Sequence, residues 1–325
     1  MSDYAMVVTA PGGVGEFRRK PIDPPEPGAG EVRLRQRAIG LNFLDVYHRS
    51  GLYPWAVPSD LVPGSEGAGT VEAIGDGVDG FAPGDRVAYT DPLGAYATVR
   101  TIRADRLVRI PDGIDDDLAA SLMLKGLTAH YLINDSFRPE PGMTVLVHAA
   151  AGGVGLLLGQ WLRARGVRAI GTVGSAAKVT LALAHGYDAV IDYGTEDFVA
   201  RVRDLTGGAG VHAVYDAVGK DTWRGSLACL CPRGHFVNFG QASGPIKGFA
   251  LTDLSKGSFH ATRPVLFHFI ADPAELAVRG AALFAALKDG ILRSEVRQNY
   301  PLHDVARAHA ELEARRTVGA SVLRT

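Results

Sequence analysis

The chain has 325 residues, enough for about two domains of ordinary size. Its hydrophobic content of 46% and charged content of 21% are typical of a globular protein, and its net charge of −1 lacks the basic excess of a nucleic-acid-binding surface. Cys229 and Cys231 are separated by one residue, a spacing that rarely forms a disulfide, so we expect both to be reduced. Without a signal segment or a long apolar run, we expect a cytoplasmic protein that does not contact membranes.

The N-terminal third has short runs of alternating apolar and polar residues, separated by glycine, proline and aspartate clusters. Such runs occupy 6–9, 31–37, 69–74, 85–89 and 97–102. This spacing predicts a small β-rich domain, a distorted barrel or sandwich. A helical pattern over 117–133 then leads into the next part of the chain.

An apolar strand pattern at 144–147 ends at a turn of small residues, and a helical pattern follows at once. The turn has the form A-x-x-G-x-x-G, beginning at Ala149. Small residues let the backbone approach a pyrophosphate, whose charge is stabilised by free N–H groups and the helix dipole. We predict that the turn binds a dinucleotide through Gly152, Gly153, Val154 and Gly155.

Strand and helix patterns alternate beyond this turn. Strands are predicted at 168–173, 188–192, 211–217, 235–239 and 258–262, with helices at 176–184, 196–205 and 222–230. Together with the strand at 144–147, they predict a six-stranded, doubly wound parallel sheet.

The alternation stops after residue 263. Helices at 273–287 and 305–315 and strands near 296 and at 320–323 follow, too few residues for a separate domain. We expect this segment to pack back onto the N-terminal part. The predicted domains are therefore a discontinuous one of residues 1–125 and 264–325 and an inserted one of residues 126–263, with the active site between them.

The second predicted strand indicates which nicotinamide cofactor binds. An NAD site usually has an acidic residue about 20 residues beyond the glycine turn, to bind the ribose hydroxyls. Here the strand ends at Gly174 and Ser175 without an acid, and Lys178 follows. Because a lysine attracts the 2′-phosphate that a carboxylate would repel, the pattern favours NADP(H).

Five motifs lie between residues 38 and 155: AIGLNFLDVY at 38–47, GLYP at 51–54, PGSEGAG at 63–69, KGLT at 125–128 and HAAAGGVG at 148–155. With these motifs the chain resembles the medium-chain dehydrogenase/reductase superfamily, and within it the quinone oxidoreductase (ζ-crystallin-like) branch. The resemblance implies a GroES-like catalytic domain, an inserted Rossmann domain and a homodimer.

Zinc-dependent alcohol dehydrogenases of the same superfamily differ from this chain at the metal sites. They carry a cysteine where Asn42 stands and a histidine where Ser65 stands, and four cysteines in the segment 91–101, which has none here. A catalytic zinc needs three protein ligands, so we expect no metal. Without a Lewis acid, reducing an electron-poor quinone or conjugated carbonyl is easier than oxidising an alcohol.

The resemblance also implies roles for individual residues. Those implied around the adenosine ribose and its 2′-phosphate are Gly174, Ser175, Lys178, Tyr193 and, from the last helix, Arg315. Those implied at the nicotinamide are Phe239, Gly240 and the hydroxyl of Thr128. The substrate-side wall is implied to consist of Asn42, Asp45, Tyr47 and Tyr53, with the two tyrosines orienting the acceptor. His148 is interpreted as a structural residue at a strand end.

Three functions remain open at this point. The first is an NADPH-dependent quinone oxidoreductase that transfers hydride to a quinone or enone. The second is a double-bond reductase for alkenals or enoyl thioesters, which would share every motif. The third is a crystallin-like, NADPH-binding structural protein with little turnover. The resemblance further suggests that the strand near 258–262 forms the dimer interface.

Overall fold

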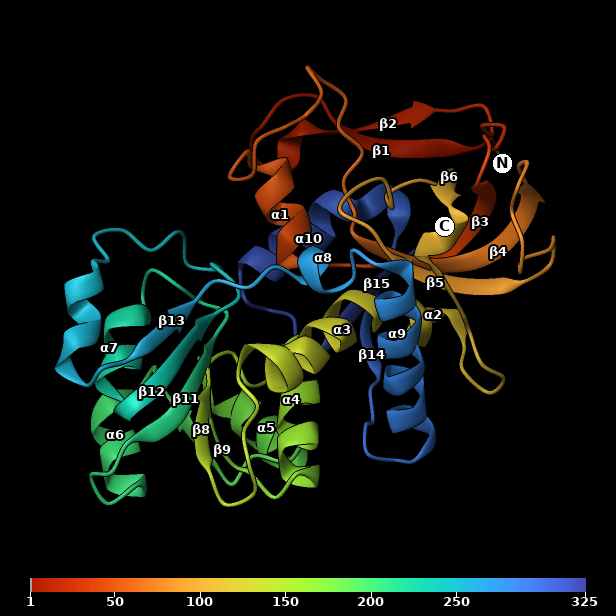
Figure 1. Ribbon diagram of the computed structural model, residues 1–325. Helices are drawn as coiled ribbons and strands as arrows, with labels where there is room; N and C mark the ends of the chain where they lie inside the picture. The colour runs from red at the N-terminus through yellow and green to blue at the C-terminus, as the bar shows by residue number, and fades with distance from the viewer. Residues whose placement is uncertain (1) are drawn as a thin grey trace. The chain divides into compact units, whose positions relative to one another are not determined.

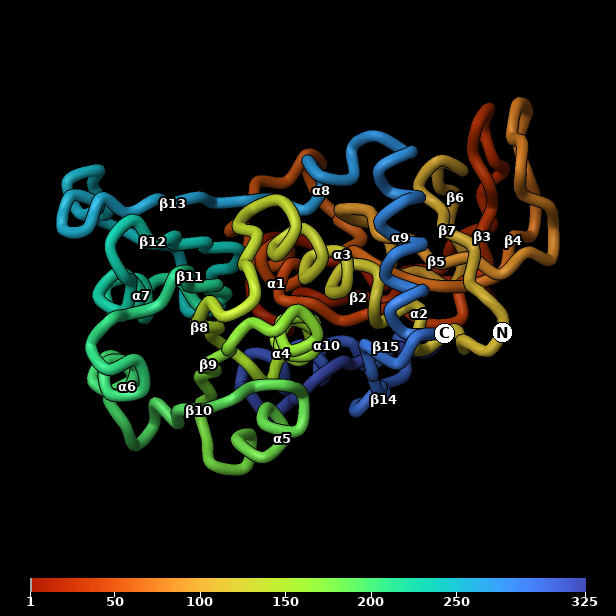
Figure 2. Tube along the Cα trace, turned by 60° about the horizontal axis from the view of Figure 1, so that its bottom comes forward, coloured from red at the N-terminus to blue at the C-terminus, as the bar shows by residue number. Residues whose placement is uncertain are grey.

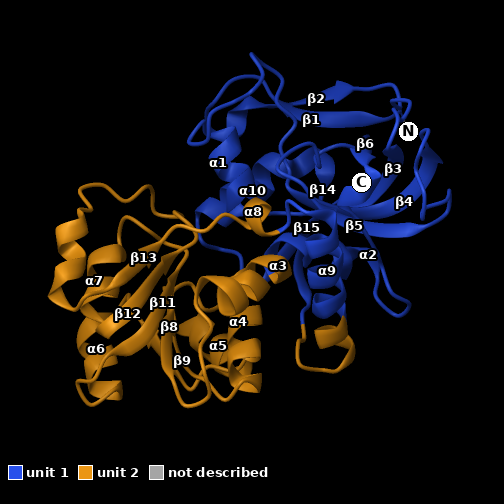
Figure 3. Ribbon diagram, viewed as in Figure 1, with its two compact units in different colours: residues 1–125, 270–284, 294–325 blue, residues 126–269, 285–293 orange. Residues whose placement is uncertain are grey.

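The computed structural model describes residues 2–325, which form two compact units (Figure 3). Unit 1 contains the described residues up to Lys125, together with Ile270–Phe284 and Ser294–Thr325. Unit 2 contains Gly126–Phe269 and Ala285–Arg293. Residues 264–269 and 285–293 thus group with unit 2, whereas the sequence-based division placed them in the first domain.

Unit 1 is built on antiparallel strands (Figure 1). Its larger sheet has the order β14-β15-β3-β4-β5-β7, with β6 also paired to β3, and β1 and β2 form a separate pair. The strands are β1 (Tyr4–Val8), β2 (Phe17–Pro21), β3 (Glu31–Gly40), β4 (Glu66–Ile74), β5 (Arg86–Thr90), β6 (Val99–Arg103), β7 (Leu107–Arg109), β14 (Val296–Pro301) and β15 (Ala320–Arg324).

Strand β3 shows how the sequence produces this sheet. Val32, Leu34 and Gln36 are buried, while the arginines between them are on the more accessible face. This period of two places the apolar residues in one core with Val71, Val87 and Tyr89 of the neighbouring strands. The C-terminal strand β15 pairs antiparallel with β3, with Val322 opposite Gly40, so the end of the chain does pack back onto the N-terminal part.

The helices assigned wholly to unit 1 are α1 (Phe43–Arg49), α2 (Asp116–Ala120) and α10 (Val305–Glu313). Helix α2 packs against β3, β4 and β5, and α1 lies beside α10. Two further helices, α3 (Met123–Tyr131) and α9 (Pro273–Lys288), have residues in both units.

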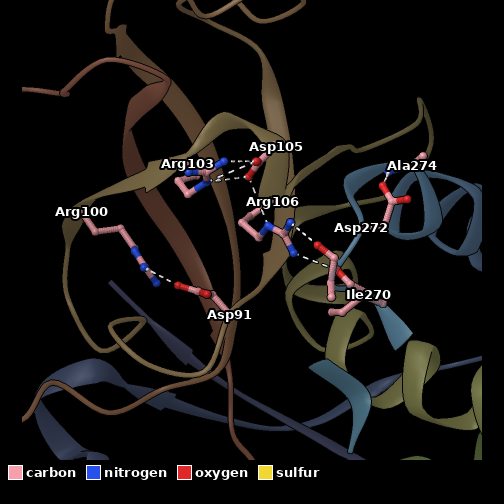
Figure 4. A network of polar contacts seen from close by, with 9 residues as sticks. Asp91, Arg100, Arg103, Asp105, Arg106, Ile270, Asp272 and Ala274 are labelled. Carbon is pink, nitrogen blue, oxygen red and sulfur yellow. Dashed lines mark hydrogen bonds and ion pairs between the residues drawn. The ribbon is translucent and has the colours of Figure 1, made fainter. Parts of the chain in front are cut away.

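Arg106 ties the returning chain to unit 1. Its guanidinium donates at 2.8 Å to the carbonyl oxygens of Ile270 and Ala271, while Asp105 binds its Nε at 3.2 Å (Figure 4). Asp272 then accepts the backbone N–H of Ala274 at the start of α9 (Figure 4). The chain therefore re-enters unit 1 at a fixed point.

Unit 2 contains, within its described residues, a six-stranded sheet of order β10-β9-β8-β11-β12-β13 in which every pair is parallel. This confirms the predicted doubly wound sheet. The strands are β8 (Thr144–Val147), β9 (Arg168–Val173), β10 (Ala189–Asp192), β11 (Val211–Asp216), β12 (Leu230–Asn238) and β13 (His260–Thr262).

Helices cover both faces of this sheet: α4 and α5 lie on one side and α6 and α7 on the other (Figures 1 and 2). Their bounds are α4 (Gly153–Ala164), α5 (Val179–Ala184), α6 (Phe198–Leu205) and α7 (Trp223–Ala228), and a short α8 (Leu266–Phe269) follows β13. Because both faces are covered, the strands read as continuous apolar runs such as Val145–Val147. Among residues 2–325, no helix has both the length and the apolar composition to cross a bilayer.

Candidate cofactor and substrate sites

The turn between β8 and α4 has the geometry of a phosphate-binding loop. Ala149 adopts a left-handed conformation with φ of 57°, and Gly152 caps α4 in an extended conformation. A Cβ on Gly155 would lie 2.7 Å from the carbonyl oxygen of Ala150 and closer still to that of Ala149. Only glycine permits this approach. As at every helix N-terminus, the first N–H groups of α4 have no intrahelical partners. The turn therefore fits a pyrophosphate.

His148, directly before this turn, is part of the core. Its Nδ1 lies 2.8 Å from the hydroxyl of Thr172 and its Nε2 lies 3.0 Å from the hydroxyl of Ser226. Burial lowers the pKa of His148, so the ring is neutral. With both nitrogens hydrogen-bonded inside the unit, the histidine acts as a polar cross-link between β8, β9 and α7.

The end of β9 brings two predicted ribose-site residues together. A Cβ on Gly174 would lie 2.6 Å from the hydroxyl oxygen of Tyr193, so the tyrosine ring rests against this glycine. Lys178 is the last residue of a 3₁₀ turn that begins at Ala176, directly after Ser175. These residues follow the carboxyl ends of β9 and β10, the edge of a doubly wound sheet at which dinucleotides bind.

The carboxyl ends of β11 and β12 contribute to the same edge. The backbone N–H of Phe239 donates to the carbonyl of Asp216 at 2.9 Å, and a Cβ on Gly240 would lie 2.5 Å from the carbonyl of Ala217. The Asp216 carboxylate binds the N–H groups of Val218 and Gly219 at 2.7 and 2.9 Å and thereby folds the loop after β11. Phe239 and Gly240 are thus held close to the end of β11.

One predicted cofactor residue and one predicted nicotinamide contact lie elsewhere in the fold. Helix α10 ends at Glu313, so Arg315 is not on the final helix as expected; it follows the helix with a left-handed φ of 58° in unit 1. A left-handed residue directly after the cap is a common way for a helix to end, and the helical pattern of 305–315 does not show where that end falls. Thr128 is buried in α3 and belongs to unit 2.

Tyr47 and Tyr53 form one aromatic pair in unit 1. Their ring centroids are 5.5 Å apart at an interplanar angle of 60°, and the backbone N–H of Tyr53 donates to the carbonyl of Tyr47 at 3.1 Å. Tyr47 is buried, and Tyr53 is half-buried at the end of the turn that follows α1. The structure thus brings the two tyrosines together on α1 and the segment after it.

Asn42, at the start of α1, is oriented by a buried carboxylate. Its amide Nδ2 donates to Glu66 Oε1 at 2.9 Å, and the backbone N–H of Leu124 donates to Glu66 Oε2 at 2.7 Å. Lys125 forms an ion pair with the same carboxylate, and both side chains are buried. Glu66 therefore links α1 to the start of α3 and determines which way the Asn42 amide faces.

Asp45, in the first turn of α1, is fully buried and accepts three hydrogen bonds. The donors are the backbone N–H of Asn42 at 2.9 Å, the hydroxyl of Tyr96 at 2.9 Å and the hydroxyl of Ser65 at 2.8 Å. Burial raises the pKa of Asp45 to about 7, against the lowering effect of these donors.

A chain of polar contacts continues from Asp45 to the surface. The Tyr96 hydroxyl lies 2.9 Å from His309 Nε2, Arg49 Nη1 lies 3.1 Å from His309 Nδ1, and Arg49 pairs with Glu313 at 2.8 Å. Sequence analysis missed Tyr96, His309 and Arg49, because 213 and 260 positions separate His309 from its two partners. No local motif signals contacts over such separations.

The residues at the two positions where zinc-dependent relatives carry ligands do not fit zinc. The Asn42 amide donates to Glu66, and the Ser65 hydroxyl donates to Asp45 or to the carbonyl of Pro92 at 3.0 Å. Within residues 2–325, no group of three or more His, Cys, Asp and Glu side chains is arranged to hold a metal ion. An amide and a hydroxyl that act as donors supply none of the thiolate, imidazole or carboxylate ligands that zinc prefers.

Comparison with known proteins identifies the same two-part architecture. The family model "Alcohol dehydrogenase GroES-like domain" matches residues 28–112, and the model "Zinc-binding dehydrogenase" matches residues 153–270. A quinone oxidoreductase from Pseudomonas aeruginosa is 51% identical over 315 residues, covering 96% of both chains. A 2-haloacrylate reductase from a Burkholderia species is 43% identical over 328 residues, covering 98% of both chains.

Among solved structures, Escherichia coli quinone oxidoreductase complexed with NADPH superposes with a TM-score of 0.96 at 42% identity, covering 99% of this chain and 100% of that one. Fold and site together define a reductase built from a GroES-like unit and a Rossmann unit. The chain belongs to the medium-chain dehydrogenase/reductase superfamily, and within it to the quinone oxidoreductase branch.

Proposed function

We propose that this oxidoreductase is an NADPH-dependent quinone oxidoreductase that transfers hydride to a quinone or conjugated carbonyl without a metal. The observation that carries the proposal is the pairing of an intact dinucleotide turn with Asn42 and Ser65 at the two ligand positions of the zinc enzymes. The NADPH-bound E. coli relative and the 51% identical Pseudomonas relative support it.

In this proposal unit 2 binds the cofactor. The N–H groups of Gly153, Val154 and Gly155, with Gly152 as the cap of α4, bind the pyrophosphate. Gly174, Ser175, Lys178 and Tyr193 bind the adenosine ribose and its 2′-phosphate, and Arg315 of unit 1 is the one proposed contact from outside unit 2. Phe239, Gly240 and Thr128 contact the nicotinamide. NADPH supplies the hydride when bound; the chain's residues orient it and exclude water.

Unit 1 provides the acceptor side. The Tyr47–Tyr53 pair offers aromatic surface to a planar acceptor, and Asn42, fixed by Glu66, and Asp45 determine the shape of the wall behind it. Because a quinone is already electron-poor, positioning accounts for most of the catalysis that is needed.

Steady-state oxidation of NADPH and NADH, measured in parallel, tests this function. The acceptors are 1,4-benzoquinone, 9,10-phenanthrenequinone and an α,β-unsaturated ketone. We expect turnover with NADPH and at least one quinone. Turnover with NADH alone would contradict the cofactor assignment, and NADPH binding without turnover of any acceptor would favour the non-catalytic, crystallin-like alternative.

Double-bond reduction is the second candidate, supported by the 43% identical 2-haloacrylate reductase. That relative acts on an activated carbon–carbon double bond, to which hydride adds as it does to a quinone. Activity on the α,β-unsaturated ketone and on 2-chloroacrylate, with none on either quinone, would establish this function in place of the first.

We also propose that the chain forms a homodimer through β13. This strand is at one edge of the parallel sheet, and the residues His260–Thr262 are all exposed. An edge strand presents unpaired backbone groups that a second copy can bind. A monomer in sedimentation velocity would contradict this assembly.

The two free cysteines fit the reducing cytoplasm, where we place the protein.

A further inference from the structure

The hydrogen bonds on one side of Asp45 have a fixed direction. Arg49 Nη1 is a donor, so His309 Nδ1 must accept, and burial, which lowers the pKa of His309 to about 3, keeps this ring neutral. The single ring proton is then on Nε2 and donates to the Tyr96 oxygen. The Tyr96 hydroxyl proton therefore donates to Asp45 Oδ2.

This direction leaves Asp45 Oδ2 with two donors, because the backbone N–H of Asn42 also binds that atom. A proton added to Oδ2 would clash with the two hydrogens already donated to that atom, so at least one of those hydrogen bonds would break. The other oxygen, Oδ1, has the hydroxyl of Ser65 as its partner. If Asp45 takes up a proton, the proton goes to Oδ1.

Ser65 is placed to accommodate both states. Its hydroxyl has one hydrogen and two acceptors within reach, Asp45 Oδ1 at 2.8 Å and the carbonyl oxygen of Pro92 at 3.0 Å. When Asp45 is ionised, the hydroxyl donates to Oδ1. When Oδ1 carries a proton, that proton donates to Ser65 Oγ, and the Ser65 hydrogen turns to Pro92. Neither state leaves a buried polar group without a partner.

The charged groups around Asp45 do not fix either state. Lys125 of α3 pairs with Glu66 of β4, and Arg49, on the last turn of α1, pairs with Glu313 of α10. Both cations are paired with other carboxylates; full burial opposes the ionised form of Asp45, while the three donors and, to a smaller extent, the charge of Lys125 favour it.

We propose that Asp45 exchanges a proton on Oδ1, with the Ser65 hydroxyl turning between Asp45 and Pro92 and with Tyr96, His309 and Arg49 as positioning residues that keep the other oxygen fixed. The proton comes from solvent and returns to it, and no other bond changes. The inference rests on the proposed function only in placing this carboxyl behind the acceptor wall.

Infrared difference spectroscopy of the full-length protein between about pH 5 and about pH 9 tests the exchange directly. We expect the carbonyl stretch of a protonated carboxyl to appear as the pH falls through neutrality, and to be missing in Asp45→Asn. The asparagine imitates the protonated form, since its amide can donate to Ser65 while its oxygen accepts from Asn42 and Tyr96. Near-ultraviolet circular dichroism confirms that the variant is folded.

Two isosteric variants test the positioning. Tyr96→Phe removes a donor to the carboxylate, so the midpoint of the carboxyl band should rise by about one pH unit or more. Ser65→Ala should shift the frequency of the band, because the protonated Oδ1 loses its acceptor. Tyr300→Phe, whose hydroxyl binds Glu311 in the same unit, should change neither and serves as the control.

The outcomes separate this inference from the proposed function. The exchange would be overturned if the wild type shows no carboxyl band that titrates near neutral pH, or if such a band persists in Asp45→Asn. An unchanged midpoint of the band in Tyr96→Phe would overturn it as well. If the band titrates as expected while the protein reduces no quinone or enone, the proposed function is wrong and the exchange stands. In an active enzyme, the inflection near pH 7 in kcat/KM should be lost in Asp45→Asn.

Discussion

Two glycines of helix α4 allow the binding of the cofactor to be separated from the stability of the fold. A Cβ on Gly155 would lie 2.7 Å from the Ala150 carbonyl oxygen, and a Cβ on Gly159 would lie 2.5 Å from the carbonyl oxygen of His185. Both approaches are below the 3.0 Å that real Cβ contacts maintain. Gly155→Ala and Gly159→Ala must therefore both displace backbone. Overpacking costs about 1–3 kcal/mol, of which the higher helix propensity of alanine offsets about 1 kcal/mol.

The two variants should differ in NADPH binding. Gly155 is in the turn whose N–H groups are proposed to bind the pyrophosphate, whereas Gly159 is one turn further along α4, against the segment before β10. A hydrogen bond to a charged group contributes about 1.5–3 kcal/mol. Losing one such bond in Gly155→Ala should raise the Kd for NADPH about tenfold or more, while Gly159→Ala should change it little.

Fluorescence titration with NADPH measures the affinity, and urea denaturation measures the free energy of unfolding. The comparison is informative because both variants carry the same substitution in the same helix. If Gly155→Ala loses stability as Gly159→Ala does but binds NADPH as the wild type does, the turn does not bind the pyrophosphate. Equal losses of affinity in both variants would mean that the displaced helix, not the turn, controls binding.

Three further predictions concern other parts of the chain. Lys178→Ala should raise the KM for NADPH about tenfold and leave the KM for NADH unchanged, since only NADPH carries the 2′-phosphate; Lys256→Ala is the control, and a parallel rise for both cofactors would refute the assignment. Arg100→Met should lower the free energy of unfolding by about 2–4 kcal/mol in urea denaturation, because the partly buried guanidinium binds Asp91 at 3.0 Å (Figure 4) and the carbonyl of Leu93 at 3.1 Å; a loss below about 0.5 kcal/mol would contradict this. Burial raises the pKa of Asp45 from 3.8 to about 7, so its folded form holds the proton more tightly than the unfolded form, and the stability it contributes is lost as the pH rises through about 7. As the pH rises from 4 to 8 in chemical denaturation, the free energy of unfolding of Asp45→Asn should therefore increase by up to about 4 kcal/mol relative to that of the wild type. A difference in unfolding free energy that stays constant over this pH range would refute the prediction.

The sequence predicted the parallel sheet well because its strands are continuous apolar runs bounded by turns. The predicted 168–173 coincides with β9, and 211–217 exceeds β11 by one residue. The short elements of unit 1 were less predictable: β2 has one buried residue in five, and β7 has three residues. Their pairing with β1 and β5, rather than any local periodicity, makes them strands.

The candidate site was predictable where a local motif carries the chemistry. The glycine turn is such a motif, because the conformation of Ala149 and the close approach at Gly155 are local requirements. The partners of Asp45 were not predictable in the same way. Tyr96 reaches Asp45 from the segment between β5 and β6, and His309 reaches Tyr96 from α10, which packs beside α1. A pattern within one element cannot indicate such a contact.

The same contacts give a structural role to Asn42 and Ser65, the two positions at which the resemblance places zinc ligands in the zinc-dependent enzymes. Glu66 and Asp45 are both fully buried carboxyl groups, and each needs hydrogen-bond donors in the absence of a bound cation. Asn42 supplies a donor to Glu66 and Ser65 supplies one to Asp45, so both residues serve the carboxyl groups instead of a metal. Changing Asn42 alone to a cysteine would remove the donor to Glu66 without completing a set of three ligands. In the proposed acceptor wall, Asn42 and Ser65 therefore satisfy the two buried carboxyl groups with hydrogen bonds, and the proposed reaction depends on the position of the acceptor rather than on its coordination.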